Sequence, residues 1–256
     1  MWKRAFLDEI PVDLECPLEV LKQIAVWVSN PEVSQQIVTL NANIIMQARR
    51  DPLLREIINR ASLISCDGMG IVWALQHHGF AVEQLTGLAI LRELLKQAML
   101  LKEKVYCYGG TPQLVERLSL VIERDWSGLE LRVADGYGIA KSEAWVHKEL
   151  LAWQPRLLIV GLGSPKQEYF LAEMLPQLSA TIGIGVGGAL EILAGFRVEA
   201  PNWIRQNGGE WIFRLLQDFR KLKRLPDLFR FYHLFLRKDT ARNLPQLVEV
   251  LPEVKD

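Results

Sequence analysis

The sequence has little cysteine, no net charge and no long uncharged apolar run. Its three cysteines, Cys16, Cys66 and Cys107, are far apart and form no CxxC pair, so the pattern suggests neither a disulfide framework nor a zinc ribbon. The formal net charge is zero because 30 basic residues balance 30 acidic ones. The chain as a whole therefore lacks the basic character of a nucleic-acid-binding protein, and we expect no nucleic-acid partner.

The absence of long apolar segments bears on the location of the protein. No uncharged apolar run approaches the ~18 residues that a membrane-spanning helix needs. The N-terminal stretch turns acidic before any apolar segment begins, unlike a signal peptide. We therefore expect a cytoplasmic protein whose contact with a membrane is peripheral. With 256 residues, half of them hydrophobic and 23% charged, the composition is that of a globular protein with a sizeable core.

Several cofactor motifs are also missing. In the stretch beginning Gly161-Leu162-Gly163, Lys166 stands where a dinucleotide-binding fingerprint has its third glycine, and no acidic residue follows about 20 positions later. A nicotinamide oxidoreductase is therefore disfavoured. The chain has no Asp-x-Asp pair, and the adjacent His77 and His78 would diverge by about 100° on a helix. We expect neither a metal ion nor another cofactor.

The chain does contain a repeated alternation of short apolar runs with helical patterns. Apolar residues recur at three- and four-residue spacing over 72–75, 88–101 and 114–122. This alternation predicts an α/β fold, a Rossmann-like parallel sheet of about six strands flanked by helices. The expected strands are Gln36–Leu40, Ser62–Cys66, Lys104–Tyr108, Leu131–Ala134, Leu157–Gly161 and Thr181–Val186.

The pattern changes near Ala200-Pro201. Strand signals end there, and the chain reads as helical to about Arg242, with Pro226 expected to break or kink the run. We predict an α/β catalytic core over residues 1–200 and a helical appendage, basic and aromatic, over residues 201–256.

Polar or glycine clusters follow all six expected strands. Ligands of parallel α/β sheets bind beyond the carboxyl ends of the strands, so six such loops at one edge indicate an extended site for a phosphate-bearing ligand. Each cluster alone has a simpler explanation as a turn or helix cap, as at Asp67-Gly68 and Asp135-Gly136. The candidate substrate-binding residues are Thr39, Asn41, Asn43, Gly109, Gly110, Thr111, Asp135, Tyr137, Gly163, Gln167, Glu168 and Gly187.

Asp67 is the best candidate for a general base. It directly follows an expected strand, and a carboxylate there can take the proton of an attacking hydroxyl. Neutral hydrogen-bonding side chains such as Thr39, Asn41 and Gln167 suit a sugar. Glu168 is a second possible acid or base, or a charge that favours the dipole of its helix.

The C-terminal segment 211–242 is basic and rich in aromatics. It holds nine Lys or Arg against three Asp, whereas residues 1–210 hold 20 basic and 24 acidic residues. Seven aromatic residues lie between Trp211 and Phe235, with apolar and basic side chains on different arcs of a helical projection. This pattern predicts a helix on an anionic membrane surface. The alternative is that the apolar arc packs on the core and the basic face is only solvated.

Nine motifs together resemble the WecG/TagA/CpsF glycosyltransferases (glycosyltransferase family 26), over roughly residues 5–240. The resemblance implies transfer of a sugar from a UDP-sugar, of the N-acetylmannosamine type or related, to a polyprenyl-diphosphate-linked sugar, with inversion and without metal. It also implies a step in bacterial cell-surface polysaccharide or teichoic-acid assembly, at the inner face of the cell membrane. The motifs are TLNANI (39–44), CDGMGIVW (66–73), LTG (85–87), YGGTP (108–112), ADGYG (134–138), VGLGSPKQE (160–168), GIGVGGALEILAG (183–195), APNWIR (200–205) and GEWIFRLLQDFRKLKR (209–224).

The same resemblance assigns roles to individual residues. Asp67 would be the catalytic base, and Thr39, Asn41 and Gln167 would line the site. The side chains that would contact the lipid diphosphate are Arg214, Lys221 and Arg224.

The sequence departs from the family pattern near the Thr-Gly step. Gln84 and Ala89 stand where the family often has Arg and Asp, and residues 136–138 read Gly-Tyr-Gly instead of Gly-Tyr-Phe. If the missing Arg and Asp read the donor, the donor differs from N-acetylmannosamine. The alternative is a non-catalytic nucleotide-sugar or membrane-binding protein of the same fold. The sequence leaves the oligomeric state open, a homo-oligomer included.

Overall fold

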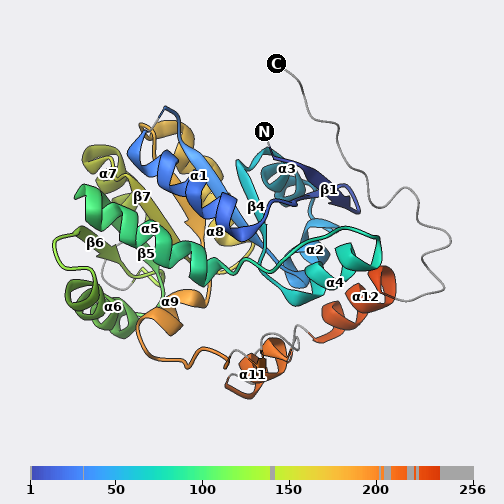
Figure 1. Cartoon of the computed structure of the whole chain (residues 1–256). Helices are drawn as coiled ribbons and strands as arrows, with labels where there is room; N and C mark the ends of the chain where they lie inside the picture. The colour runs from blue at the N-terminus through green and yellow to red at the C-terminus, as the bar shows by residue number, and fades with distance from the viewer. Residues whose placement is uncertain are drawn as a thin grey trace.

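The computed structural model describes residues 2–30, 32–138, 142–201, 203–204, 209–217, 222 and 225–236. All six expected strands are present, each within one residue of its expected bounds, and they form one parallel sheet (Figure 1). Its order is β4-β3-β8-β7-β5-β6. The strands are β3 (Gln35–Leu40), β4 (Leu63–Cys66), β5 (Lys104–Gly109), β6 (Glu130–Ala134), β7 (Leu157–Gly161) and β8 (Ile182–Gly185).

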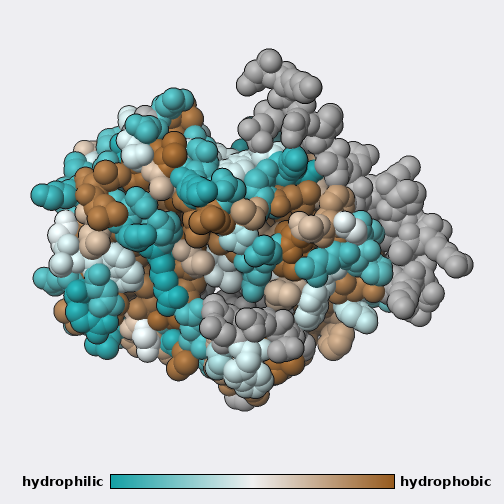
Figure 2. Space-filling model, viewed as in Figure 1, coloured by the Kyte–Doolittle hydropathy of each residue, from teal (hydrophilic) through white to brown (hydrophobic). Residues whose placement is uncertain are grey.

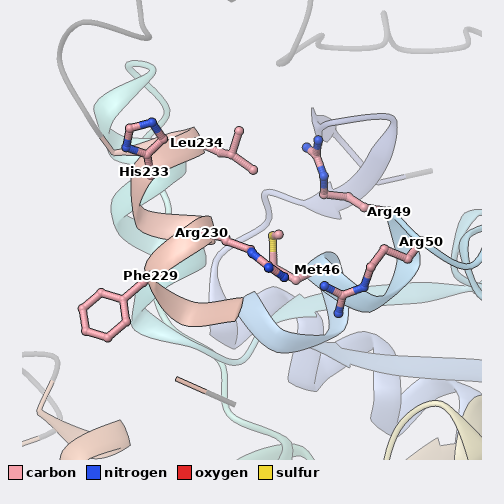
Figure 3. Close-up of a pocket in the computed structure, with 7 residues that line it drawn as sticks. All are labelled: Met46, Arg49, Arg50, Phe229, Arg230, His233 and Leu234. Carbon is pink, nitrogen blue, oxygen red and sulfur yellow. The ribbon is translucent and has the colours of Figure 1, made fainter. Parts of the chain in front are cut away.

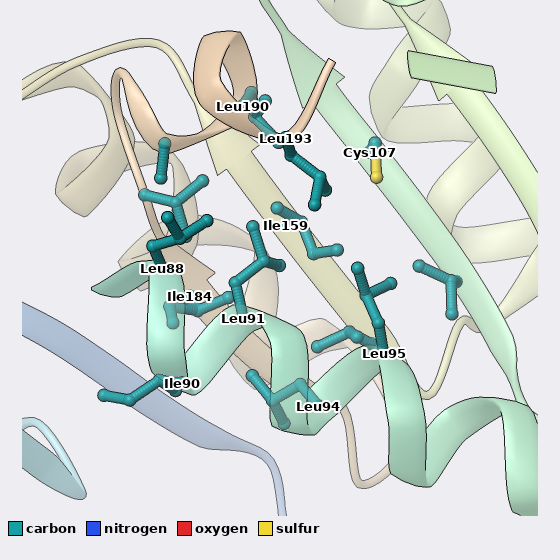
Figure 4. Close-up of a cluster of buried hydrophobic side chains, with 14 of the residues drawn as sticks. Leu88, Ile90, Leu91, Leu94, Leu95, Cys107, Ile159, Ile184, Leu190 and Leu193 are labelled. Atoms are coloured by element: carbon teal, nitrogen blue, oxygen red, sulfur yellow. The ribbon is translucent and has the colours of Figure 1, made fainter. Parts of the chain in front are cut away.

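One face of the sheet is covered by α1 (Pro17–Ser29), α5 (Gly87–Leu101), α6 (Pro112–Asp125) and α9 (Ala189–Leu193). Figure 4 shows how α5 does this, with Leu88, Leu91 and Leu95 directed at Ile159 and Ile184 of the neighbouring strands. These leucines recur at three- and four-residue spacing, so they share one helix face. The apolar positions that recur in the sequence are therefore the residues through which α5 contacts the sheet.

The opposite face is covered in two sections. The helices α7 (Glu143–Trp153) and α8 (Lys166–Met174) pack on β5 and β7, and a single 3₁₀ turn, η1 (Leu175–Gln177), follows α8. The helices α2 (Ala42–Ala48), α3 (Pro52–Arg60) and α4 (Met69–His77) pack on β3 and β4. Because α6 and α8 lie on opposite faces, the crevice between their strands β5 and β7 is a topological switch point, where α/β proteins commonly bind ligands.

The N-terminal residues form an antiparallel hairpin that we did not predict, β1 (Arg4–Leu7) and β2 (Ile10–Asp13). Its two turn residues, Asp8 and Glu9, have positive φ angles of 53° and 64°. Such turns favour Asn-Gly, Asp-Gly or Gly-Gly, and here Glu9 stands where glycine is usual, so the hairpin signal in the sequence is incomplete. Ion pairs from Asp8 to Arg49 and from Glu9 to Arg55 hold the turn against α2 and α3.

Two helices of the C-terminal segment are described, α11 (Glu210–Gln217) and α12 (Leu225–Phe235). Pro226 is the second residue of α12, where proline is tolerated because the first-turn N–H groups have no helical partner. In α12, Phe231 and Phe235 are 1% and 2% exposed and pack with α2 and α4. In the part of the chain that the structure describes, no helix is both long and apolar enough to cross a membrane.

Candidate active site

Asp67 lies at the carboxyl edge of the sheet, directly after β4. Its backbone N–H donates to the carbonyl oxygen of Leu40, the last residue of β3, at 3.0 Å. Its carboxylate Oδ1 accepts a hydrogen bond from the Gly87 N–H at 2.8 Å. Gly87 is the first residue of α5, and a helix N-terminus favours a nearby negative charge. The half-buried carboxylate is therefore held in place by a rigid element.

Gly87 and Gln84 were not among the predicted site residues. The side chain of Gln84 donates from Nε2 to the Asp67 carbonyl oxygen at 2.6 Å. Thr86 caps α5 by accepting from the Ala89 N–H at 3.2 Å. A threonine before an apolar helical run is an N-cap signal in the sequence, but its position beside Asp67 depends on the tertiary structure.

Thr39 lies in β3, which pairs on one side with β4, the strand that leads into Asp67, and on the other side with β8. It is 6% exposed, and its Oγ1 donates to the Gly185 carbonyl oxygen of β8 at 3.1 Å. A Cβ placed on Gly87 would lie 2.9 Å from Thr39 Cγ2, closer than real contacts allow. Only glycine therefore lets α5 approach Thr39 this closely while its N–H reaches Asp67.

Gln167 joins this group from the other side of the strand β8. Its Oε1 accepts from the Gly187 N–H at 3.0 Å, and its Nε2 donates to Glu168 Oε1 at 2.9 Å. A Cβ on Gly185 would lie 2.6 Å from Gln167 Nε2, so the amide lies directly on the backbone of β8. The contacts run without a gap from Asp67 through Gly87, Thr39 and Gly185 to Gln167.

Glu168 is a buried carboxyl at the end of this chain of contacts. Glu168 is only 2% exposed. Burial raises the pKa of Glu168, while hydrogen bonds from Gln167 and Ser164 act in the opposite direction. The protonated form is thus favoured more than in an exposed glutamate.

The structure also places Asn41 beside Asp67, but in a capping role. Its Oδ1 accepts from the N–H groups of Asn43 and Ile44 at 3.1 and 3.2 Å, so Asn41 is the N-cap of α2. A Cβ on Gly68 would lie 3.1 Å from Asn41 Cβ, which shows how closely the two loops meet. The cap uses the amide oxygen and not the amide nitrogen. Asn43 lies one residue inside the helix and is half-buried.

The remaining sheet-edge candidates form a second group, at the ends of β5, β6 and β7. Gly109, with a φ angle of 135°, meets the backbone of Gly161 so closely that a Cβ on it would lie 2.5 Å away. Gly136 lies against Gly109 and Gly110 in the same way. Three post-strand loops therefore meet so closely that a Cβ at Gly109 or Gly136 would clash with its neighbours.

The polar members of this second group satisfy neighbouring backbone groups. Thr111 caps α6 by accepting from the Leu114 N–H at 3.2 Å. Asp135 is 3% exposed and accepts from the Tyr137 N–H at 3.1 Å, while Tyr137 itself is 69% exposed. Gly163, with a φ angle of 78°, has open space where a side chain would be. No hydrogen bond described in the structure links Thr111 or Tyr137 directly to Asp67.

The C-terminal helix α12 covers the edge where α2 and α4 begin. A Cβ on Gly70 would lie 3.5 Å from the Phe231 ring and 3.7 Å from Ala42 Cβ. Gly70 is three residues beyond Asp67, so α12 borders the candidate site. Of the predicted lipid-contacting residues, Lys221 and Arg224 lie outside the described residues, and so does the side chain of Arg214.

Large apolar side chains are exposed along the C-terminal segment. Figure 2 shows hydrophobic side chains at the surface along the lower edge of the molecule, where Figure 1 places α11 and α12. The exposed side chains of the segment are those of Trp203, Ile212, Leu216, Leu222, Phe229 and Tyr232, and just before it Phe196 and Val198 are exposed as well. Some residues of the segment thus pack on the core, as Phe231 does, while others face outward.

Among the described residues, no group of three or more His, Cys, Asp or Glu side chains could hold a metal ion.

Comparison with known proteins gives one consistent result. The model of the Glycosyl transferase WecG/TagA/CpsF family matches residues 6–244. An N-acetylglucosaminyldiphosphoundecaprenol N-acetyl-beta-D-mannosaminyltransferase of Staphylococcus aureus strain MW2 is 30% identical over 88% of this chain and 89% of its own length. The proteins of the same name from strains NCTC 8325 / PS 47 and MRSA252 are 30% and 29% identical over the same shares.

Proposed function

Because the chain belongs to the WecG/TagA/CpsF family of glycosyltransferases, we propose that it moves a sugar from a UDP-sugar to a polyprenyl-diphosphate-linked sugar. The names of the Staphylococcus aureus relatives describe such an acceptor and an N-acetylmannosamine-type donor sugar. The step would belong to the synthesis of a bacterial cell-surface polysaccharide or teichoic acid. The donor sugar is N-acetylmannosamine or a related sugar. Related sugars are included because Gln84 and Ala89 depart from the family pattern.

The observation that carries the proposal is the Asp67 carboxylate, fixed by the Gly87 N–H at 2.8 Å at the edge of the sheet. The acceptor hydroxyl attacks the anomeric carbon of the donor and gives its proton to Asp67. The new glycosidic C–O bond forms on the face opposite the breaking bond to UDP, so the configuration inverts. Asn41, whose N-cap bonds use only the amide oxygen, would offer its amide nitrogen to the hydroxyls of the bound sugars. Gln167, with both amide atoms bonded to Gly187 and Glu168, would hold the backbone of this edge in place.

The leaving UDP carries negative charge that the site has to stabilise. The 14-residue helix α6 begins at the loop Gly109–Thr111, and its N-terminal N–H groups suit a phosphate. Basic side chains of the C-terminal segment are the other proposed contacts. In this proposal, fixed dipoles and charges stabilise the leaving UDP without a metal ion.

The test is UDP release from a UDP-sugar panel with a short-chain prenyl-diphosphate-sugar acceptor, with and without EDTA. We expect Asp67→Asn to lower kcat by about 10²–10⁴-fold, the contribution of a general base. Asp125→Asn, an exposed aspartate at the end of α6, is the matched control and should retain full activity. Full activity of Asp67→Asn would remove Asp67 from this role, and loss of wild-type activity in EDTA would contradict the metal-free mechanism.

We place the protein at the inner face of the cell membrane, bound peripherally through residues 201–256, with residues 1–200 as the catalytic core. The exposed side chains Trp203, Ile212 and Leu216 support this, since apolar groups at a membrane surface leave water. The packing of Phe231 beside Gly70 supports a membrane-facing site, because the same segment would bring the lipid-linked acceptor to Asp67.

A further inference from the structure

A cavity formed by described residues lies away from the sheet edge, between the end of α2 and α12. It is open to solvent and has a volume of about 520 Å³. Figure 3 shows Arg230 extending from α12 toward Met46, with the guanidinium group of Arg50 close by and Arg49 above. The lining residues are Met46, Arg49, Arg50, Phe229, Arg230, His233 and Leu234.

The cavity is separate from the candidate active site. The N-cap residue Asn41 marks the site end of α2, and Arg49 follows the last residue of the same helix. The eight steps from Asn41 to Arg49, at 1.5 Å each, separate the two ends by about 12 Å. An occupant of the cavity would therefore not compete with a sugar at Asp67.

The charge of the cavity favours an anion. Asp8 pairs with Arg49 at 2.5 Å, and Asp227 pairs with Arg50 through two bonds of 2.7 Å and with Arg230 at 3.5 Å. Three guanidinium groups thus share two carboxylates, which leaves one positive charge. Each guanidinium has five N–H donors in a planar fork that matches phosphate oxygens. The 3.5 Å pair is the weakest of these contacts, and Arg230 is 64% exposed, so it is the arginine best able to turn to a ligand.

The rest of the cavity wall is apolar. Met46 and Leu234 line it from α2 and α12, and Phe229, 67% exposed, stands at its rim. A free inorganic anion would gain nothing from these side chains. An anion attached to a hydrocarbon chain would use both parts of the wall.

We propose that this cavity binds the phosphate group of an anionic membrane phospholipid, with the adjoining glycerol and first acyl carbons against Phe229 and Leu234. The inference deepens the proposed membrane association and rests on it. A specific headgroup contact would fix the orientation of α12 relative to the membrane. It would thereby also fix the position of Phe231 beside Gly70. Arg50 and Arg230 would hold the phosphate. The ion pair with Asp227, a residue of α12, would keep the Arg50 side chain beside that helix.

Vesicle sedimentation tests the proposal with the full chain. Arg230→Gln should weaken binding to vesicles of phosphatidylglycerol and phosphatidylcholine about five-fold, the effect of one arginine at an anionic membrane surface. Arg124→Gln removes an equally exposed arginine from α6 and should leave binding unchanged. Equal binding by wild type and both variants would overturn the proposal for the cavity and leave the membrane association standing. Equal loss in both variants would also overturn it, because net charge alone would then explain binding.

A second experiment separates lipid from free phosphate and does not need a membrane. Soluble dihexanoyl-phosphatidylglycerol should shift the Nε–H NMR signals of Arg50 and Arg230 saturably, and inorganic phosphate should do so at least ten-fold more weakly. Similar affinities for the two would contradict a lipid ligand, since the apolar wall would contribute nothing. If wild type fails to bind vesicles but binds the soluble lipid, the membrane association fails while the cavity assignment stands.

Discussion

Gly87 matters to the candidate active site because it has no side chain. It donates its N–H to Asp67 while its Cα approaches Thr39 too closely for a Cβ. Asp67, Thr39 and Gln167 could be selected from the sequence because polar residues at or beyond the carboxyl ends of strands mark the binding edge of a parallel sheet. Gly87 could not, because its role depends on an approach between segments 48 residues apart in the chain.

Replacing Gly87 should therefore damage activity more than stability. In Gly87→Ala the new methyl group would lie 2.9 Å from Thr39 Cγ2, and the branched, buried threonine cannot move aside freely. We expect the Gly87 N–H to shift away from Asp67 and kcat to fall about 10–100-fold, with a small decrease in Tm. Gly70→Ala, whose methyl group would find ordinary contacts of 3.5 Å and longer, is the control. Equal activity of both variants would show that the Gly87 contact does not position the carboxylate.

The helix α12 shows how one element divides its residues between two surfaces. Phe231 and Phe235 are buried against α2 and α4, whereas Phe229 and Tyr232 are 67% and 59% exposed. The sequence left open whether the apolar residues of this segment face a core or a membrane. For α12 the structure places some in the core and leaves others at the surface, because aromatic residues occur on more than one side of the helix.

A matched pair of substitutions separates these two surfaces. Phe231→Ala removes a buried ring and should destabilise the attachment of α12 by about 3–5 kcal/mol. Phe229→Ala, with the same change on the same helix, should cost little because its ring is already exposed. Hydrogen exchange of the α12 amides measures both, with faster exchange expected in Phe231→Ala alone. If both variants exchange alike, α12 is held by something other than its buried aromatic face.

At the scale of the whole molecule, the unpredicted hairpin is tied to the sheet by a buried carboxylate. Asp13, at the end of β2, accepts from Arg4 Nε at 2.7 Å and from the Ile64 N–H of β4 at 2.7 Å. Burial is the largest influence and raises the pKa of Asp13 from 3.8 to about 6, although both hydrogen bonds act against it. The folded protein therefore keeps this proton at pH values where the unfolded chain has already released it.

This proton makes the stability of the molecule pH-dependent in a definite direction. Between pH 4 and 6 the folded state binds more protons at Asp13, so its stabilising contribution falls as the pH rises through that window. The side-chain amide of the variant Asp13→Asn cannot titrate. We expect the free energy of unfolding of wild type, relative to Asp13→Asn, to fall by about 2–3 kcal/mol from pH 4 to pH 7, measured by urea unfolding. A constant or rising difference would contradict the raised pKa.

The elements of this protein are largely a property of its sequence. The six strands and the helices after them follow from apolar periods and turn residues that act within a few positions of each other. The motifs at 160–168 and 209–224, in this order, were also specific enough to indicate the family. Local signals failed at the N-terminal hairpin, because Asp8 and Glu9 occupy a turn that is stabilised by Arg49 and Arg55 from other segments.

The arrangement of those elements was decided by the tertiary structure. The order β4-β3-β8-β7-β5-β6 inserts β8 beside β3, which brings Thr39 against Gly185 although 146 positions separate them. The same order places Gly185 between Thr39 and Gln167, and the packing of Phe231 sets α12 beside Gly70, three residues from Asp67. These contacts have no local signal, because they arise only when distant apolar faces are buried together in one core.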